Sequence, residues 1–170
     1  MSGKISPETS VLSETMLIPL WAKAVEQERS ESERLLTDRE APRILAQIDY
    51  DFSKYKKIVM SQVGCCGRAW IFDDEARAFI AAHPDAVVVQ LGAGLDARFE
   101  RLDRPAVTAW YDLDLPEVIE LRQQLLPASS NHYLGVSMFD ESWMQTVAAF
   151  GKPVLLLCEG VLMYFDEATV

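Results

Sequence analysis

The sequence predicts an α/β protein with a mostly parallel sheet of about four strands, and three observations support this. The valine-rich run Ala86 to Leu91 ends at two glycines, which is typical of a buried parallel strand. A second apolar run, Pro153 to Cys158, has the same character. Segments with a helical period precede and separate these runs. We expect strands at about 86–91, 106–113, 132–137 and 153–158, in the spatial order 3-2-1-4.

The segment before the first strand is expected to be helical. Apolar residues recur with a helical period from Met16 to Glu28, with Pro19 in the first turn. A second helix is predicted after Thr37 or Asp38. The run Gly64 to Arg68 is expected to interrupt the helical pattern. Further helices are predicted over 52–62 and 73–82 before the sheet, over 97–102, 117–126 and 142–150 within it, and from Asp166 on.

The turn after the first strand carries the strongest functional signal. Gly92 and Gly94 let the backbone approach a ligand where any Cβ would intrude, and a helix beginning near Ala97 would point free N–H groups at the same place. The spacing also satisfies the dinucleotide fingerprint, with an acidic residue about twenty positions on, at Asp112 or Asp114. The turn therefore predicts a nucleotide-cofactor loop, against the alternative of a tight turn without a ligand.

Asp96 helps to choose between cofactors. A carboxylate at the start of that helix suits a helix cap but would repel a diphosphate. This favours S-adenosylmethionine, which has no phosphate, over a nicotinamide dinucleotide. Such a cofactor needs an acidic acceptor for its ribose hydroxyls, a cation for its carboxylate and acceptors for its ammonium. Asp114, just beyond the second strand, and Glu159, at the carboxyl end of the last strand, are placed for two of these tasks.

Composition excludes several classes of partner. The formal net charge of −10, from 26 acidic and 16 basic residues, opposes nucleic acid and an anionic membrane surface. We find no apolar run long enough to span a bilayer and no signal-peptide pattern at the start, so we expect a cytoplasmic protein. Three cysteines without CxxC spacing and two distant histidines indicate neither a disulfide framework nor a metal site.

Three motifs in order carry a resemblance to a known family. They are GAGLDAR at 92–98, DLDLPEV at 112–118 and CEGVLMYF at 158–165. The chain resembles the leucine carboxyl methyltransferase family, in its bacterial and fungal branch similar to tetracenomycin polyketide O-methyltransferases, from about Leu17 to the last residue. The resemblance implies a Rossmann-like class I methyltransferase fold, with residues 1–72 as a helical cap and 73–170 as the cofactor-binding core.

The resemblance also implies roles for individual residues. Arg68 would bind the cofactor carboxylate, unless it only pairs with Asp73 or Asp74, and Glu159 would bind the ammonium, unless it is structural. The family motif favours Asp114 over Asp112 for the ribose. The remaining candidates are Lys23 and the glycines Gly92 and Gly94 at the cofactor, Ser137 and Met138 at the adenine, and Tyr164 and Phe165 in an acceptor pocket or in ordinary core packing.

The resulting hypothesis is an S-adenosylmethionine-dependent O-methyltransferase for a small-molecule hydroxyl or carboxylate, with a polyketide-like acceptor among the candidates. The alternatives are a nicotinamide-dependent oxidoreductase and a non-catalytic cofactor-binding fragment. The family's sheet has seven strands, so the apolar strand 153–158 would lack its next neighbour here. We therefore expect a piece of a longer protein or a homo-oligomer joined through the open sheet edge, poorly active on its own. No residue is assigned a catalytic role.

Overall fold

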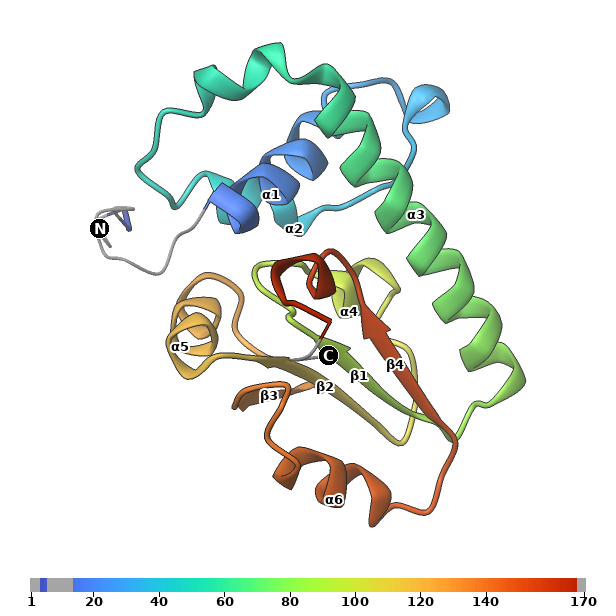
Figure 1. Cartoon of the computed structure of the whole chain (residues 1–170). Coiled ribbons are helices and arrows are strands. Elements are labelled where there is room, and N and C mark those ends of the chain that lie inside the picture. The colour runs from blue at the N-terminus through green and yellow to red at the C-terminus, as the bar shows by residue number, and fades with distance from the viewer. Residues whose placement is uncertain (1–3, 6–13, 168–170) are drawn as a thin grey trace.

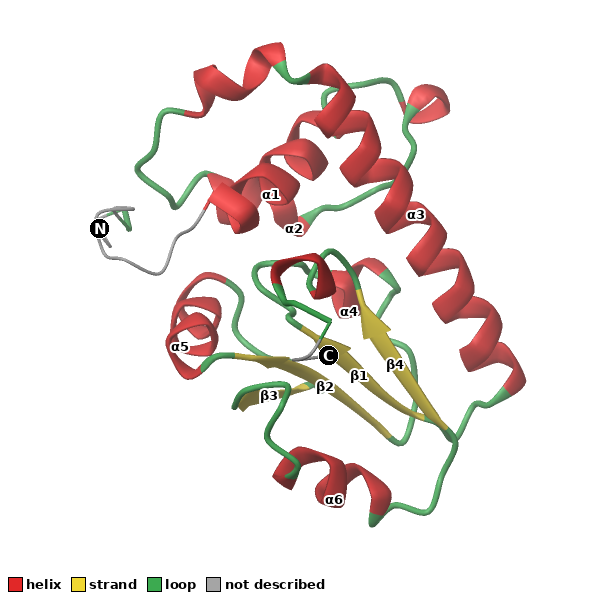
Figure 2. Cartoon of the chain, viewed as in Figure 1, coloured by secondary structure: helices red, strands yellow, loops and turns green. Residues whose placement is uncertain are grey.

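The structure is a computed structural model that describes residues 4–5 and 14–167. Its centre is a four-stranded sheet in the order β3-β2-β1-β4, and every strand pairs with its neighbours in parallel. This confirms the predicted α/β class and strand order. The helix expected from Asp166 on falls largely outside the described residues. The strands are β1 (Val87–Leu91), β2 (Ala109–Asp114), β3 (His132–Gly135) and β4 (Val154–Cys158), which Figure 2 shows in yellow.

The strand β1 is an inner strand of the sheet, because it pairs with β2 on one side and with β4 on the other. Val89 is in register with Tyr111 and with Leu156. All five residues of β1 are buried, as expected for a parallel strand covered on both faces. The sheet thereby brings the carboxyl ends of β1, β2 and β4 to one edge, where ligands of open α/β sheets bind.

Three helices precede the sheet: α1 (Glu14–Glu26), α2 (Glu40–Leu45) and α3 (Val59–Ala82). Figure 1 shows α1 and α2 above the sheet, on the side toward which the β4 arrow points, and α3 running from that group down beside the sheet. Leu17, Ile44 and Cys66 are fully or almost fully buried in one apolar cluster of these helices. Leu121 and Leu125 from α5 (Pro116–Leu125) join the same cluster, so it connects the helical group to the sheet.

The predicted interruption of the helical pattern at Gly64 to Arg68 is wrong, because α3 is one continuous helix from Val59 to Ala82. The predicted helix over 52–62 is instead a 3-10 helix over Phe52–Lys57, followed by the start of α3. Glycine is tolerated inside a helix at about 1 kcal/mol relative to alanine. Packing of Cys66 and Ala69, both 0% exposed, offsets that cost. The expected domain boundary after residue 72 lies inside α3 and stays a prediction.

The two faces of the sheet are covered by different helices. On one face Trp143 and Val147 of α6 (Ser142–Ala148) pack against Val87 and Val89. On the other face Phe99 of the one-turn helix α4 (Arg98–Arg101) joins a cluster that holds Val88, Trp110 and Ala76 of α3.

The fourth strand lies at an edge of the sheet, where the predicted order puts it. In the described part of the chain β4 pairs with β1 alone. Two of its side chains, Val154 and Leu156, are 39% and 52% exposed, although their sequence pattern is that of a strand covered on both faces. Among the described helices, none has both the length and the apolar character needed to cross a membrane.

Candidate functional site

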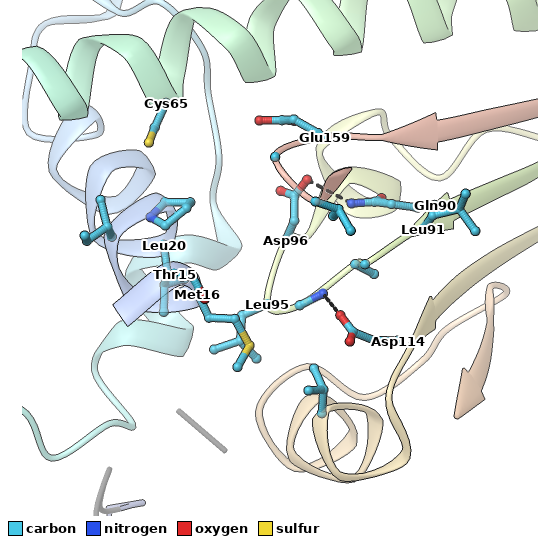
Figure 3. Close-up of a pocket in the computed structure, with 18 of the residues that line it drawn as sticks. Thr15, Met16, Leu20, Cys65, Gln90, Leu91, Leu95, Asp96, Asp114 and Glu159 are labelled. Atoms are coloured by element: carbon cyan, nitrogen blue, oxygen red, sulfur yellow. Dashed lines mark hydrogen bonds between the residues drawn. The ribbon is translucent and has the colours of Figure 1, made fainter. Parts of the chain in front are cut away.

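A cavity of about 940 Å³ lies between the helical group and the carboxyl ends of β1, β2 and β4 (Figure 3). It contains most of the site residues predicted from the sequence. Those that line it are Lys23 of α1, Arg68 of α3, Gly92 and Gly94 after β1, Asp114 at the end of β2, Glu159 after β4, and Tyr164 and Phe165. Residues as far apart in the sequence as Lys23 and Phe165 therefore meet in one place.

The glycine turn has a left-handed backbone at both glycines. Gly92 and Gly94 have φ values of +63° and +49°, in the left-handed region that favours glycine. A Cβ on Gly92 would lie 2.4 Å from a methyl carbon of Val161, and one on Gly94 would lie 3.3 Å from Cγ of Met16. The turn therefore admits very close neighbours, and here those neighbours are side chains of the protein itself.

The expectation that Asp96 caps the following helix is wrong. The helix α4 has four residues, its N-cap residue is Ala97, and no side chain caps it. Asp96 instead accepts a hydrogen bond of 2.6 Å from Nζ of Lys23 and another of 2.7 Å from Nη1 of Arg101. Gln90 donates a third, of 3.1 Å, which Figure 3 shows as a dashed line. Asp96 thus belongs to a buried group of charges.

The charges around Asp96 decide its ionisation. Burial alone would raise its pKa, but Arg101, Lys23 and Arg98 together outweigh burial and hold the pKa of Asp96 well below its usual value. Asp96 is therefore a carboxylate whose charge is neutralised within the protein. Lys23 is not a solvated helix residue, because its side chain is 5% exposed and lies against the cavity.

The two acids of the DLDLP segment have different environments. Asp114 lines the cavity, and its two carboxylate oxygens accept backbone N–H bonds of 2.7 Å from Gly94 and 2.8 Å from Leu115. Burial raises the pKa of Asp114, although these two N–H groups oppose the shift. An ionised carboxylate has about four lone-pair sites, so about two stay available on a side chain that is already oriented.

Asp112 points away from the cavity into the protein. It is 0% exposed and accepts hydrogen bonds from Trp110 at 3.1 Å and Asn131 at 2.6 Å. Nη2 of the fully buried Arg122 lies 3.2 Å from its carboxylate. The structure therefore separates the alternatives that the fingerprint leaves open, since Asp114 alone of the two lines the cavity.

Arg68 and Glu159 form an ion pair with each other. Nε of Arg68 donates to Oε1 of Glu159 at 2.9 Å, across 91 positions of sequence. The alternative of a local pair between Arg68 and Asp73 or Asp74 is wrong. Asp73 accepts from Arg98 at 2.8 Å and from Arg101 at 2.6 Å, and Asp74 is exposed.

Two further arginines of the site were not predicted. Arg98, 0% exposed, donates to Oε2 of Glu159 and to Asp73, and Arg101 donates to Asp38, Asp73 and Asp96. Both follow the glycine turn directly, and their spacing of three residues on a helix puts them on one side of it. The sequence signal that could have found them is the position of both arginines shortly after Asp96.

The adenine candidates lie apart from the cavity lining. Oγ of Ser137 accepts a backbone N–H bond of 3.2 Å from Phe139, and the carbonyl of Met138 accepts one of 3.0 Å from the indole of Trp143. Neither residue lines the cavity, so their role at the adenine stays a prediction.

Both acceptor-pocket candidates line the cavity near its surface. They belong to the segment that forms the 3-10 helix Leu162–Tyr164. Tyr164 is 59% exposed, which does not fit ordinary core packing. Phe165 makes an edge contact with Phe139, with the ring centres 4.9 Å apart.

Comparisons with known proteins all find similarity to methyltransferases. A family model described as leucine carboxyl methyltransferase matches residues 16–170. The "Tetracenomycin polyketide synthesis O-methyltransferase TcmP" of Streptomyces glaucescens is 38% identical over 156 residues, which cover 91% of this chain and 57% of that protein. A "Putative S-adenosyl-L-methionine-dependent methyltransferase" of Mycobacterium sp. (strain KMS) is 37% identical over 100 residues, 51% of this chain and 33% of that protein.

A relative from Parafrankia sp. (strain EAN1pec), described in the same words, is 28% identical over 171 residues, 89% of this chain and 54% of its own length. The chain therefore spans about half the length of the relatives that it matches most fully.

Proposed function

This chain belongs to the leucine carboxyl methyltransferase family, and we propose that it forms the cofactor-binding part of an S-adenosylmethionine-dependent O-methyltransferase for a small-molecule hydroxyl or carboxylate. One observation carries the proposal. The cavity is lined by one cation for the cofactor's carboxylate, one anion for its ammonium and one acceptor for its ribose hydroxyls. These are Arg68, Glu159 and Asp114.

The residues of the cavity fit this cofactor in their chemistry. A guanidinium binds a carboxylate through parallel N–H donors, so Arg68 suits the carboxylate end. Glu159, with a side chain that is 9% exposed, suits the ammonium. Asp114 has lone pairs left for two hydroxyl groups after its two backbone hydrogen bonds. When bound, the cofactor supplies an electrophilic methyl group on a sulfonium sulfur.

The protein's own contribution to such a reaction is binding and orientation. Methyl transfer is an in-line displacement, so the acceptor oxygen must be held in line with the methyl carbon and the sulfur. A carboxylate acceptor needs no base, whereas a hydroxyl acceptor profits from one. Neither His83 nor His132 lines the cavity, and burial raises the pKa of the Cys65 thiol that does. These observations support an acceptor that reacts without a strong base from this part of the chain.

The acceptor is proposed to be an apolar small molecule. Met163, Tyr164 and Phe165 together line the cavity near its surface, and all three are at least 38% exposed. Such a wall suits an aromatic or polyketide-like compound. The printed name of the Streptomyces relative supports a polyketide-like acceptor as one candidate. The charge of −10 argues against nucleic acid and membrane partners, and three free thiols favour the cytoplasm.

The oxidoreductase alternative has less support. Asp96 no longer argues against a diphosphate by its charge, because Lys23, Arg98 and Arg101 neutralise it. What opposes a diphosphate is the turn itself, because Val161 lies against Gly92 and Met16 lies against Gly94. The relatives are described as methyltransferases, which does not favour a nicotinamide cofactor.

Calorimetric titration tests the proposal directly. S-adenosylmethionine and its demethylated product S-adenosylhomocysteine are expected to bind with a stoichiometry of one, and NADH is expected to show no heat of binding. Glu75→Gln, an exposed substitution on α3 outside the cavity, serves as a control that should bind like the unsubstituted chain. The proposal would be overturned if NADH binds and neither S-adenosylmethionine nor S-adenosylhomocysteine does.

A further inference from the structure

Glu159 is held by two guanidinium groups that differ in their surroundings. Its Oε1 accepts from Arg68, whose side chain is 39% exposed, and its Oε2 accepts from Arg98, whose side chain is 0% exposed. Arg68 comes from α3 of the helical group, and Arg98 comes from α4, directly after the glycine turn. Each oxygen of this carboxylate therefore has its own cation.

Arg98 is fixed by further partners on the protein side. Its Nε donates to Asp73 at 2.8 Å, and its Nη2 lies 3.4 Å from Asp96. Its guanidinium carbon lies 5.5 Å from the centre of the Phe72 ring. Asp73 is held in turn by Arg101, at 2.6 and 3.0 Å. Moving Arg98 would remove one cation from each of three buried carboxylates, Asp73, Asp96 and Glu159, which is unfavourable.

Arg68 is held much less firmly. In the described part of the chain Glu159 is its ion-pair partner, and the guanidinium lies against Gly160, where a Cβ would lie 3.0 Å from Nη2. Gly160 leaves room for the guanidinium because it has no side chain, and its φ of +68° favours glycine there. Partial exposure and a single carboxylate partner make this contact the replaceable one of the two.

We infer that Arg98 is a positioning residue that keeps Glu159 in place while Arg68 is exchanged for the ligand, an inference that rests on the proposed function. A zwitterionic ligand end brings one ammonium and one carboxylate. The ammonium replaces Arg68 at Oε1 of Glu159, and the carboxylate takes up the released Arg68. No charge of the site or of the ligand end is left without a partner, and Arg98 stays on Oε2 throughout.

This exchange makes the site selective for the α-amino-acid group. A ligand with an ammonium but no carboxylate leaves Arg68 without a partner, and a ligand with neither gains nothing from breaking the pair. The adenosine end, at Asp114, is bound independently of this exchange. Arg98 should therefore affect affinity for the amino-acid end and leave affinity for the adenosine end unchanged.

The test compares two ligands on the same variants. S-adenosylhomocysteine has the amino-acid end, and 5′-methylthioadenosine lacks it. In Arg98→Lys the single ammonium cannot bridge Asp73 and Glu159 as the guanidinium does. We expect this variant to lose about tenfold in affinity for S-adenosylhomocysteine and to bind 5′-methylthioadenosine as the unsubstituted chain does.

Further variants separate positioning from general structure. Arg77→Lys, an exposed position on the same α3, should change neither affinity. Glu159→Gln should lower the preference for S-adenosylhomocysteine over 5′-methylthioadenosine. Because Arg98 acts through Glu159, the double variant with Arg98→Lys should show the same preference as Glu159→Gln alone. Arg98→Met serves as a second probe, with its folding checked by circular dichroism.

The outcomes are distinguishable. If the unsubstituted chain binds neither ligand, the proposed function fails and the inference fails with it. If it binds both, and Arg98→Lys weakens both equally or neither, the inference alone is overturned. A tenfold loss confined to S-adenosylhomocysteine, absent in the Glu159→Gln background, supports it.

Discussion

Arg68 on α3 and Glu159 after β4 form an ion pair of 2.9 Å that joins the helical group to the sheet across the mouth of the cavity. Each was predicted to bind a different charged group at the amino-acid end of the ligand, and the structure shows them bound to each other. The pair is therefore both the candidate binding site and a link between the two parts of the chain that build it.

Replacing Arg68 should weaken the ligand and leave the fold intact. Arg68→Ala is expected to lower the affinity for S-adenosylmethionine by about tenfold to a hundredfold, because the carboxylate of the bound ligand loses its cation. The side chain is 39% exposed, so thermal unfolding should change little. Calorimetry and a melting curve measure the two effects. Unchanged affinity in Arg68→Ala would remove Arg68 from the site, and Arg77→Ala is the matched exposed control on the same helix.

The two acids of DLDLP should fail in different ways when replaced. Asp114→Ala is expected to cost about 1.5 to 3 kcal/mol of cofactor affinity, the usual worth of hydrogen bonds to a charged group. Asp112→Ala is expected to cost about 3 to 5 kcal/mol of folding stability instead, since it leaves the buried Arg122 unpaired. Titration calorimetry and denaturant unfolding measure these. If Asp112→Ala folds normally and binds worse than Asp114→Ala, the assignment is reversed.

Glu100 should make the protein less stable at neutral pH. Both of its carboxylate oxygens are buried without a hydrogen-bond partner in the described residues, and burial raises its pKa above the ordinary 4.5. The folded state therefore binds its proton more tightly than the unfolded state, so stability is lost as pH rises through the folded pKa. Glu100→Gln is expected to stabilise the fold by about 1 kcal/mol at pH 7.

The gain from Glu100→Gln should shrink as the pH falls toward about 4, where Glu100 of the unsubstituted chain is protonated in the folded state. Denaturant unfolding at both pH values measures the difference, with the exposed Glu75→Gln as the control. A gain that is equal at both pH values would show that ionisation of Glu100 is not its cause.

The open edge of β4 should make this chain associate with a second copy. Among the described residues β4 pairs with no strand but β1. Val154 and Leu156 are 39% and 52% exposed, and an open edge of this kind is a template for strand pairing. Light scattering is expected to give a mass above the 19.1 kDa of one chain, together with weak methyl transfer. Leu156→Lys should shift the preparation toward the monomer, and the exposed Gln145→Lys should not. A monomeric preparation with robust methyl transfer contradicts this prediction.

The sequence by itself determined the strand order, the close approach at the glycine turn and several of the residues that line the cavity. These follow from local patterns: valine-rich runs predict buried strands, Gly92 and Gly94 predict a turn without side chains, and strand ends predict where Asp114 and Glu159 meet. Such signals depend on neighbours within a few positions, so they can be found in one sequence.

The tertiary structure alone decided which charges pair. Two glycines suggested a break at Gly64 to Arg68, yet packing against the rest of the helical group keeps α3 continuous. Asp96 was assigned to a helix cap, although Lys23, which binds it, lies 73 positions away. Arg98 was given no role, because Asp73 and Glu159, to which it donates, lie 25 and 61 positions away. A buried charge takes the nearest opposite charge that the fold supplies, and that distance exists only after the chain has folded.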